Sequence, residues 1–266
     1  MLIAQQWRRQ VASLVGWSVT LFTTTLLTLL AVKSLLTGPS LGQLTLLIEQ
    51  LPPALRAYMG VTPGEVTVNT WVISLVFRTI APLVLTVYTA LAALSVLTRD
   101  MDAGVADFLL ALPLRRERLL LSRFLVAVLN IAVLHGALLL SVFLGTRMVG
   151  YEPRWREYAL MVLNSYLVQA ALLSLVLLIT VFVTDYTQGL FVALGLSLGL
   201  YFLSLAIEPG TKLAGLRWLS VFTYSRPNEV MRTGGIPPGD AAVLLISFVC
   251  LLAAAVFLFN SKQIST

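Results

Sequence analysis

The sequence predicts that residues 1–266 form a single all-α membrane domain with six transmembrane helices, and three observations support this fold class. Hydrophobic residues make up 58% of the chain and charged residues 11%, whereas soluble domains contain roughly 45–50% apolar and about 25% charged residues. Six apolar stretches reach the ~20 residues that a helix needs to cross a bilayer. The charged residues lie mostly between these stretches, as is typical of a multi-pass membrane protein.

The order of the spans follows directly from these stretches. They cover residues 14–36, 71–97, 124–146, 158–184, 189–207 and 241–259. Before the first span, Ile3, Trp7, Val11 and Leu14 recur at steps of four, four and three. This pattern predicts an amphipathic helix over residues 1–13 that lies in the membrane interface.

An even number of spans places both termini on one side of the membrane. The face that the termini share comprises residues 1–13, 98–123, 185–188 and the tail from 260. The opposite face comprises residues 37–70, 147–157 and 208–240. The first face carries eight Lys and Arg residues in roughly fifty positions and the second carries eight in nearly eighty, so we expect the first to be cytoplasmic. Prolines and glycines punctuate the two long outer segments, which we expect to form short helices on or in the outer leaflet.

The densest charge cluster of the chain lies in the predicted cytoplasmic loop at residues 98–123. Four apolar residues of this loop fall at i, i+3, i+4 and i+7: Val105, Phe108, Leu109 and Leu112. The spacing predicts one apolar stripe on a helix of about three turns, with Asp102 at its N-cap and Pro113 at its end. Such a helix suits docking into a groove of another protein. Periodicity leaves two alternatives open, that the helix rests on the headgroups or that it folds back onto its own bundle.

The residue order in this loop resembles that of the ABC-2-type permeases, the membrane subunits of ATP-driven type-2 ABC exporters. An acidic–Ala–Gly start at residues 102–104 precedes DFLLALP at residues 107–113 and RRE at residues 115–117. Residues 47–55 and 219–236 resemble the helix after the first span and the stretch before the last span in the same family. The resemblance therefore covers essentially the whole chain.

The resemblance implies that this loop holds the coupling helix, which contacts the ATPase subunit in such exporters. The residues that it assigns to coupling are Asp102, Gly104, Val105, Phe108, Leu109, Leu112, Pro113, Arg115, Arg116 and Glu117. Val105 departs from the family, which usually has threonine there. The resemblance further implies two ABC ATPase subunits per complex, which carry ATP and Mg²⁺, and a second permease copy or a related permease in the cell membrane. This chain itself would hold no cofactor and no metal, and the position of the loop supports cytoplasmic termini.

The sequence lacks the residues for bond chemistry of its own. A phosphate-binding loop of the form G-x-x-x-x-G-K-[ST] needs a glycine before its lysine, but Lys33, Lys212 and Lys262 follow valine, threonine and serine. The one histidine, His135, has no obvious acidic neighbour for a Ser-His-Asp arrangement. The one cysteine, Cys250, excludes an internal disulfide and a multi-cysteine metal site. We therefore expect no enzyme activity in this chain.

Three residues inside the spans are candidates for a translocation path: Arg78, Thr86 and His135. Ionisable residues inside a membrane are functional candidates by default, and Thr86 stands two helical turns after Arg78 on the same helix face. The structural alternatives are that Arg78 extends to the interface and that His135 is a hydrogen-bonded residue of the bundle. Four further polar residues either line a path or bond across helices: Asn130, Asn164, Tyr166 and Gln169.

Small residues recur at four-residue spacing in two spans. They are Gly16, Thr20, Thr24 and Thr28 in the first span, and Gly195 and Gly199 in the fifth. Small residues at this spacing let helices approach closely. We therefore expect them to serve packing within the chain, with a seam between two permeases as the alternative.

The apolar, charge-poor spans suit a hydrophobic or amphipathic substrate such as a drug, a lipid or a peptide. A secondary transporter is an alternative, but it would need coupling residues near the midplane and often internal repeats, and His135 is the one such residue in view. A non-transport scaffold or sensor subunit would leave the coupling-like loop without an explanation. The net charge of +6 arises at span ends and loops, where basic residues contact lipid headgroups, so no nucleic-acid partner is expected.

Overall fold

A computed structural model of the chain describes residues 2–37, 46, 50, 68–97, 116–183, 185–207 and 214–261. Within these ranges the protein is helical and contains no strand, which confirms the predicted all-α class. The long helices are α1 (Leu2–Thr37), α5 (Ala81–Leu97), α7 (Arg116–Val149), α8 (Trp155–Thr180), α9 (Tyr186–Ala206) and α11 (Pro238–Ser261). The short elements are α4 (Val68–Trp71), the π-helical η1 (Val72–Ile80), the 3₁₀ helices η2 (Ala214–Leu219) and η3 (Val221–Tyr224), and α10 (Pro227–Thr233).

Among the described residues, six helical runs are long and apolar enough to cross a membrane, which confirms the predicted number of spans. They are Gln10–Ser34, Asn69–Leu97, Glu117–Val149, Trp155–Thr180, Tyr186–Ala206 and Pro238–Ser261. The second span joins α4, η1 and α5 in one continuous helical run. Helix α7, which contains the third span, begins at Arg116, so the last third of the predicted loop 98–123 belongs to α7. The region predicted as an interfacial helix is continuous with the first span in α1, and its placement in the interface stays a prediction.

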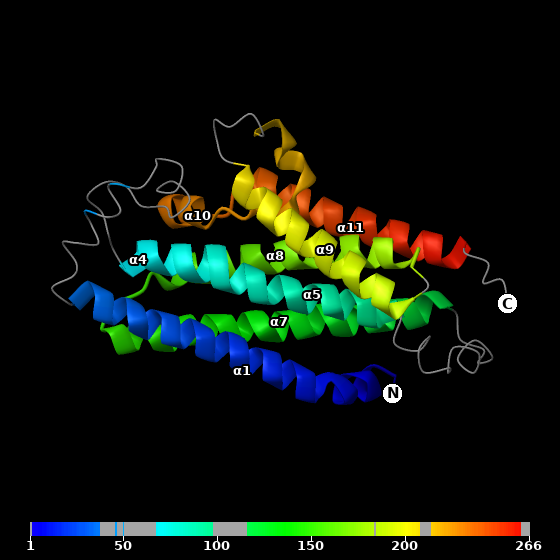
Figure 1. The fold of residues 1–266 in the computed structure, drawn as a ribbon, viewed down its shortest axis with the longest axis horizontal. Helices are drawn as coiled ribbons and strands as arrows, with labels where there is room; N and C mark the ends of the chain where they lie inside the picture. The colour runs from blue at the N-terminus through cyan, green and yellow to red at the C-terminus, as the bar shows by residue number, and fades with distance from the viewer. Residues whose placement is uncertain are drawn as a thin grey trace.

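The long helices form an elongated bundle in which α5, α7 and α8 pack against one another at the centre (Figure 1). Helix α1 runs along α7, α9 crosses over α5, and α11 packs against α8 (Figure 1). The first residues of α1 and the last residues of α11 lie at the same end of the bundle, where α5 ends and α7 begins (Figure 1). The short helix α10 lies at the opposite end, against α8 and η1.

The core sits where α5 meets α8. Their fully buried side chains include Leu85 and Leu94 of α5 and Leu172, Leu173 and Leu177 of α8. The outer helices instead present large apolar side chains outward, as Leu27 of α1, Ile246 of α11 and Phe257 of α11 are all exposed. Because lipid tails are as apolar as leucine, these outward faces carry no penalty in a membrane.

Packing of α1 differs from the sequence expectation. The side chains of α1 that are buried in the chain include Leu14, Leu21 and Leu29, and Leu29 fits against Gly145 of α7 so closely that a Cβ there would collide with it. Of the four small residues predicted to pack within the chain, Gly16 and Thr20 are exposed, whereas Thr24 and Thr28 are partly buried. Two hydroxyls of these residues need no partner on another helix. Thr20 donates to the Gly16 carbonyl at 2.9 Å, and Thr28 donates to the Thr24 carbonyl at 2.8 Å.

The small residues of α9 are likewise not used for packing within the described part of the chain. Gly195 and Gly199 are exposed, and a Cβ at either position would meet nothing within 4 Å. The expectation of intrachain packing is therefore wrong for both glycines. The α9 glycine that packs closely is Gly189, since a Cβ there would lie 2.6 Å from Leu94 of α5.

Replacing Gly145 by leucine should separate α1 from α7. The added side chain would overpack the contact with Leu29, which typically costs about 1–3 kcal/mol, and the melting temperature of the purified protein in detergent should fall. Ala132→Leu on the same helix is the matched control, because Ala132 is exposed. Equal melting temperatures for the two variants would contradict this packing.

Candidate coupling and translocation site

The ends of the two helices that flank residues 98–115 are held together. The Arg123 guanidinium of α7 donates from Nη1 to the Val96 carbonyl of α5 at 3.1 Å. Two residues before Val96, Leu94 of α5 is buried against Gly189 of α9. Helix α9 starts there because the Asp185 carboxylate accepts from the Gln188 backbone N–H at 2.8 Å, a standard N-cap bond. The tips of α5, α7 and α9 are thus tied to one another at one end of the bundle.

Most of the coupling residues predicted from the sequence lie outside the described residues. These are Asp102, Gly104, Val105, Phe108, Leu109, Leu112, Pro113 and Arg115. Arg116 and Glu117 form the first turn of α7, where a carboxylate is favoured by the positive end of the helix dipole. The described residues therefore show the two helices to which the predicted coupling segment is attached.

A buried polar contact joins α5 to α8 near the middle of the bundle. The Thr89 hydroxyl donates to Oε1 of Gln169 at 2.9 Å, and Nε2 of Gln169 donates to the Thr86 hydroxyl at 3.4 Å. All three side chains are at most 1% exposed. The carboxamide therefore uses both of its polar ends on one neighbouring helix, and Thr86 faces α8.

His135 makes the corresponding contact from α7 to α8. Its Nδ1 lies 2.8 Å from the Ile131 carbonyl and its Nε2 lies 3.2 Å from the Ser165 hydroxyl. Because a carbonyl only accepts, Nδ1 of the neutral ring carries the proton and Nε2 accepts from Ser165. The Tyr166 ring meets the imidazole edge-to-face, with centroids 5.5 Å apart. These contacts match the structural alternative stated for this histidine, and they use both ring nitrogens.

Arg78 lies in the π-helical segment η1, at the other end of the second span. The turns there are wide, since the Thr79 hydroxyl donates to the Ser74 carbonyl five residues back and the Ala81 N–H donates to Val76. The Tyr201 hydroxyl of α9 donates to the Arg78 carbonyl at 3.0 Å. The backbone of the widened segment is therefore attached to α9, and the Arg78 side chain is partly exposed.

The three candidate path residues do not form one cluster. Thr86 and His135 contact α8 from two different helices, and Arg78 contacts α9 through its backbone. The site residues predicted from the sequence do not include Ser165, Arg123 or Tyr201. Tyr201 carried a usable signal, because a tyrosine in an apolar span must find a partner for its hydroxyl.

The segment before the last span closes the end of the bundle opposite the chain termini. Ser220 before η3 donates to the Leu200 carbonyl of α9 at 2.8 Å, and Asn164 of α8 donates to the Tyr224 carbonyl at 3.3 Å. Arg226 lies 3.1 Å from carboxylate oxygens of both Glu229 and Asp240, which joins α10 to the start of α11. The short helices thus pack on α8, α9 and α11.

Comparison with known proteins identifies the family. The model of the ABC-2 family transporter proteins matches residues 50–264, which include all spans after the first and the predicted coupling loop. No curated protein and no solved structure matches the chain. The match covers most of the chain and agrees with the six apolar helices. This protein therefore belongs to the ABC-2 family of transporter proteins and is a multi-pass membrane component of an ABC transporter.

Proposed function

We propose that this chain is the permease subunit of an ATP-driven exporter, and that it forms the path and transmits motion from separate ATPase subunits. The observation that carries the proposal is the family match over residues 50–264, which spans the loop with the DFLLALP motif at residues 107–113. The sequence contains no lysine in a phosphate-binding loop. ATP and Mg²⁺ would therefore bind to the partner subunits.

The contacts at the base of the loop support mechanical coupling. A push on residues 98–115 would reach α5 and α7 together, because Arg123 bonds to Val96 across their tips. From α5 the displacement would reach α9 through Leu94 against Gly189, and α8 through Gln169. Helices in a protein interior are close-packed, so a displacement of one helix end displaces the helices packed against it.

The assembly that we propose contains two ATPase subunits and two permeases, either two copies or this chain and a related one. The exposed glycines Gly195 and Gly199 of α9 support pairing, since their face is free of other parts of the described chain and small residues allow close helix approach. ATP-driven closure of the ATPase subunits would tilt the permeases and switch access to the path between them.

A hydrophobic or amphipathic substrate fits the described spans best. Several of their fully buried polar groups, such as Thr86, Asn130 and Gln169, are neutral. No described group of three or more His, Cys, Asp or Glu side chains could hold a metal ion. Such a path offers few charges to a polyanion. The secondary-transport alternative loses support, because both ring nitrogens of His135 are engaged by Ile131 and Ser165.

Phe108→Asp should abolish co-purification of the ATPase subunit while membrane insertion stays normal. A carboxylate in the apolar stripe would have to be buried unpaired in the docking groove, which is strongly unfavourable. Leu110→Asp is the matched control, because it lies on the opposite side of the predicted helix from Phe108. Normal ATPase pull-down and transport by Phe108→Asp would show that this helix does not dock.

Single-cysteine labelling tests the orientation. With Cys250→Ser as a cysteine-free background, Glu152→Cys in the turn before α8 should react with a membrane-impermeant maleimide in intact cells. Thr187→Cys at the start of α9 should react only after the membrane is opened. Both positions are exposed, so reagent access is comparable. The reverse labelling pattern would place the termini outside the cytoplasm.

The substrate class can be measured on the reconstituted complex of the permease with its ATPase subunit. Hydrophobic peptides, lipids or apolar drugs should raise the ATPase rate, because substrate binding between the permeases favours the closed state of the motor. A polyanionic oligosaccharide should leave the rate unchanged. Stimulation by the polyanion alone would contradict the proposed substrate class.

A further inference from the structure

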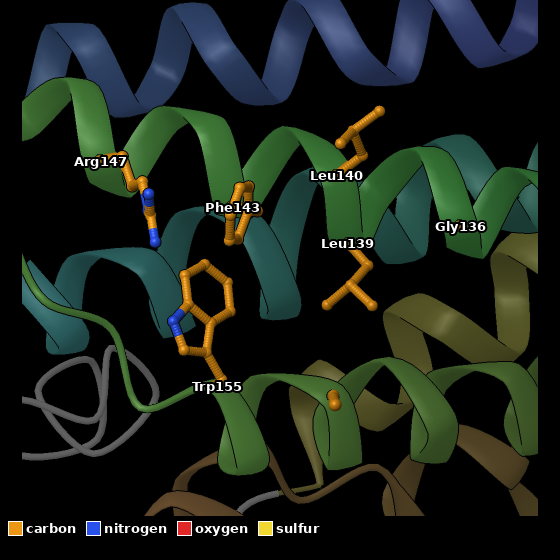
Figure 2. Close-up of a pocket in the computed structure, with 7 residues that line it drawn as sticks. Gly136, Leu139, Leu140, Phe143, Arg147 and Trp155 are labelled. Atoms are coloured by element: carbon orange, nitrogen blue, oxygen red, sulfur yellow. The ribbon is translucent and has the colours of Figure 1, made fainter.

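A groove opens toward the membrane between α7 and α8, on a face that none of the contacts described above uses. Its volume is about 650 Å³, and its apolar wall includes Gly136, Leu139 and Phe143 of α7 and Ala159 of α8. Arg147 and Trp155 lie together at one end, where α7 ends and α8 begins (Figure 2). The groove is thus apolar along its length and polar at a single end.

The polar end is a stack of three side chains. The Arg147 guanidinium carbon lies 4.8 Å from the centroid of the Phe143 ring, and the Phe143 and Trp155 centroids are 4.5 Å apart. Figure 2 shows the Arg147 and Trp155 side chains reaching toward each other from the two helices. The Phe143 ring therefore holds the guanidinium over the groove, an arrangement that stabilises a cation.

The charge of Arg147 is not neutralised by the described part of the protein. Arg147 is exposed, and no carboxylate within the described ranges forms an ion pair with it. Glu157, in the first turn of α8, extends toward Gly234 after α10 instead. A guanidinium presents planar pairs of N–H donors that match phosphate oxygens, so the end of the groove is complementary to a phosphate.

The length of the groove matches one leaflet of a bilayer. At 1.5 Å per residue, the rise along α7 from Gly136 to Arg147 is about 16 Å. Half of a hydrocarbon core of ~30 Å is about 15 Å. With Arg147 and Trp155 at headgroup depth, where such residues are enriched, Gly136 lies near the bilayer midplane. The groove has the dimensions of one acyl chain below one headgroup.

We propose that this groove is a binding site for one anionic glycerophospholipid of the leaflet at the Arg147 end. The lipid phosphate accepts from the Arg147 guanidinium and the Trp155 indole N–H. One acyl chain lies along Leu139 and Ala159 and ends beside Gly136. The bound lipid bridges α7 and α8, and this role depends neither on the ATPase partner nor on the orientation of the chain in the membrane.

The charged end is tested by native mass spectrometry of the full-length protein in detergent micelles, titrated with dioleoylphosphatidylglycerol. Arg147→Gln should weaken binding of the first lipid about tenfold, the scale expected for one lost hydrogen-bonded contact to a charged group. Arg156→Gln, which removes an exposed cation one helical position beyond Trp155, should bind as the unchanged protein does. Equal binding by Arg147→Gln, or an equal loss in Arg156→Gln, would overturn the site.

The apolar end is tested by filling it. Gly136→Leu should remain folded, since a Cβ there meets nothing within 4 Å, yet its side chain occupies the space of the acyl chain and should reduce lipid binding. Ala132→Leu, an exposed small-to-large change one turn further along α7, should not. The proposal would be overturned if Gly136→Leu bound lipid as well as the unchanged protein does, or if the protein bound neutral phosphatidylcholine with equal affinity. It would also be overturned if the mass spectrum of Gly136→Leu showed loss of a protein dimer and no loss of bound lipid.

Discussion

The structure depends on one constraint, that backbone and side-chain polar groups inside a bilayer must find partners within the protein. Several hydroxyls in the spans meet it locally, as Thr146 donates to the Val142 carbonyl at 2.7 Å. The π-helical segment η1 meets it through a neighbour, since the Tyr201 hydroxyl bonds to the Arg78 carbonyl. The same constraint drives longer polar side chains to bond between helices. Hydrogen bonds between neutral side chains therefore join α5 and α7 to α8.

These bonds converge on α8, which is the most enclosed of the spans. Gln169 of α8 hydrogen-bonds to Thr86 and Thr89 of α5. Ser165 of α8 hydrogen-bonds to His135 of α7. Helices α5 and α7 are also the two that lead into residues 98–115. In the proposed function, the two helices that would transmit motion from the loop are thus bonded to the centre of the bundle. The outer helices α1 and α11 remain largely exposed on the outside of the bundle.

Hydropathy was sufficient to predict the number of spans and their order, because the length of an apolar run reports directly on the bilayer. It could not predict which side of a helix packs. Gly16 and Thr20 of α1 are exposed, whereas Leu21 and Leu29 are buried. Lipid is as apolar as a neighbouring helix, so hydropathy does not distinguish the face that packs from the face that meets lipid. The hydrogen bond from Thr89 of α5 to Gln169 could not be predicted from the sequence either, because the two residues are eighty positions apart and meet only in the folded bundle.

The most direct test of the account is the structure of the permease with its ATPase subunits, solved with and without bound nucleotide. The account predicts that residues 102–113 are seated in the ATPase surface. It also predicts that the tips of α5 and α7 shift together between the two states, with the bond from Arg123 to the Val96 carbonyl retained. A loop that stands clear of the ATPase, or an α5 that moves while α7 stays fixed, would contradict it.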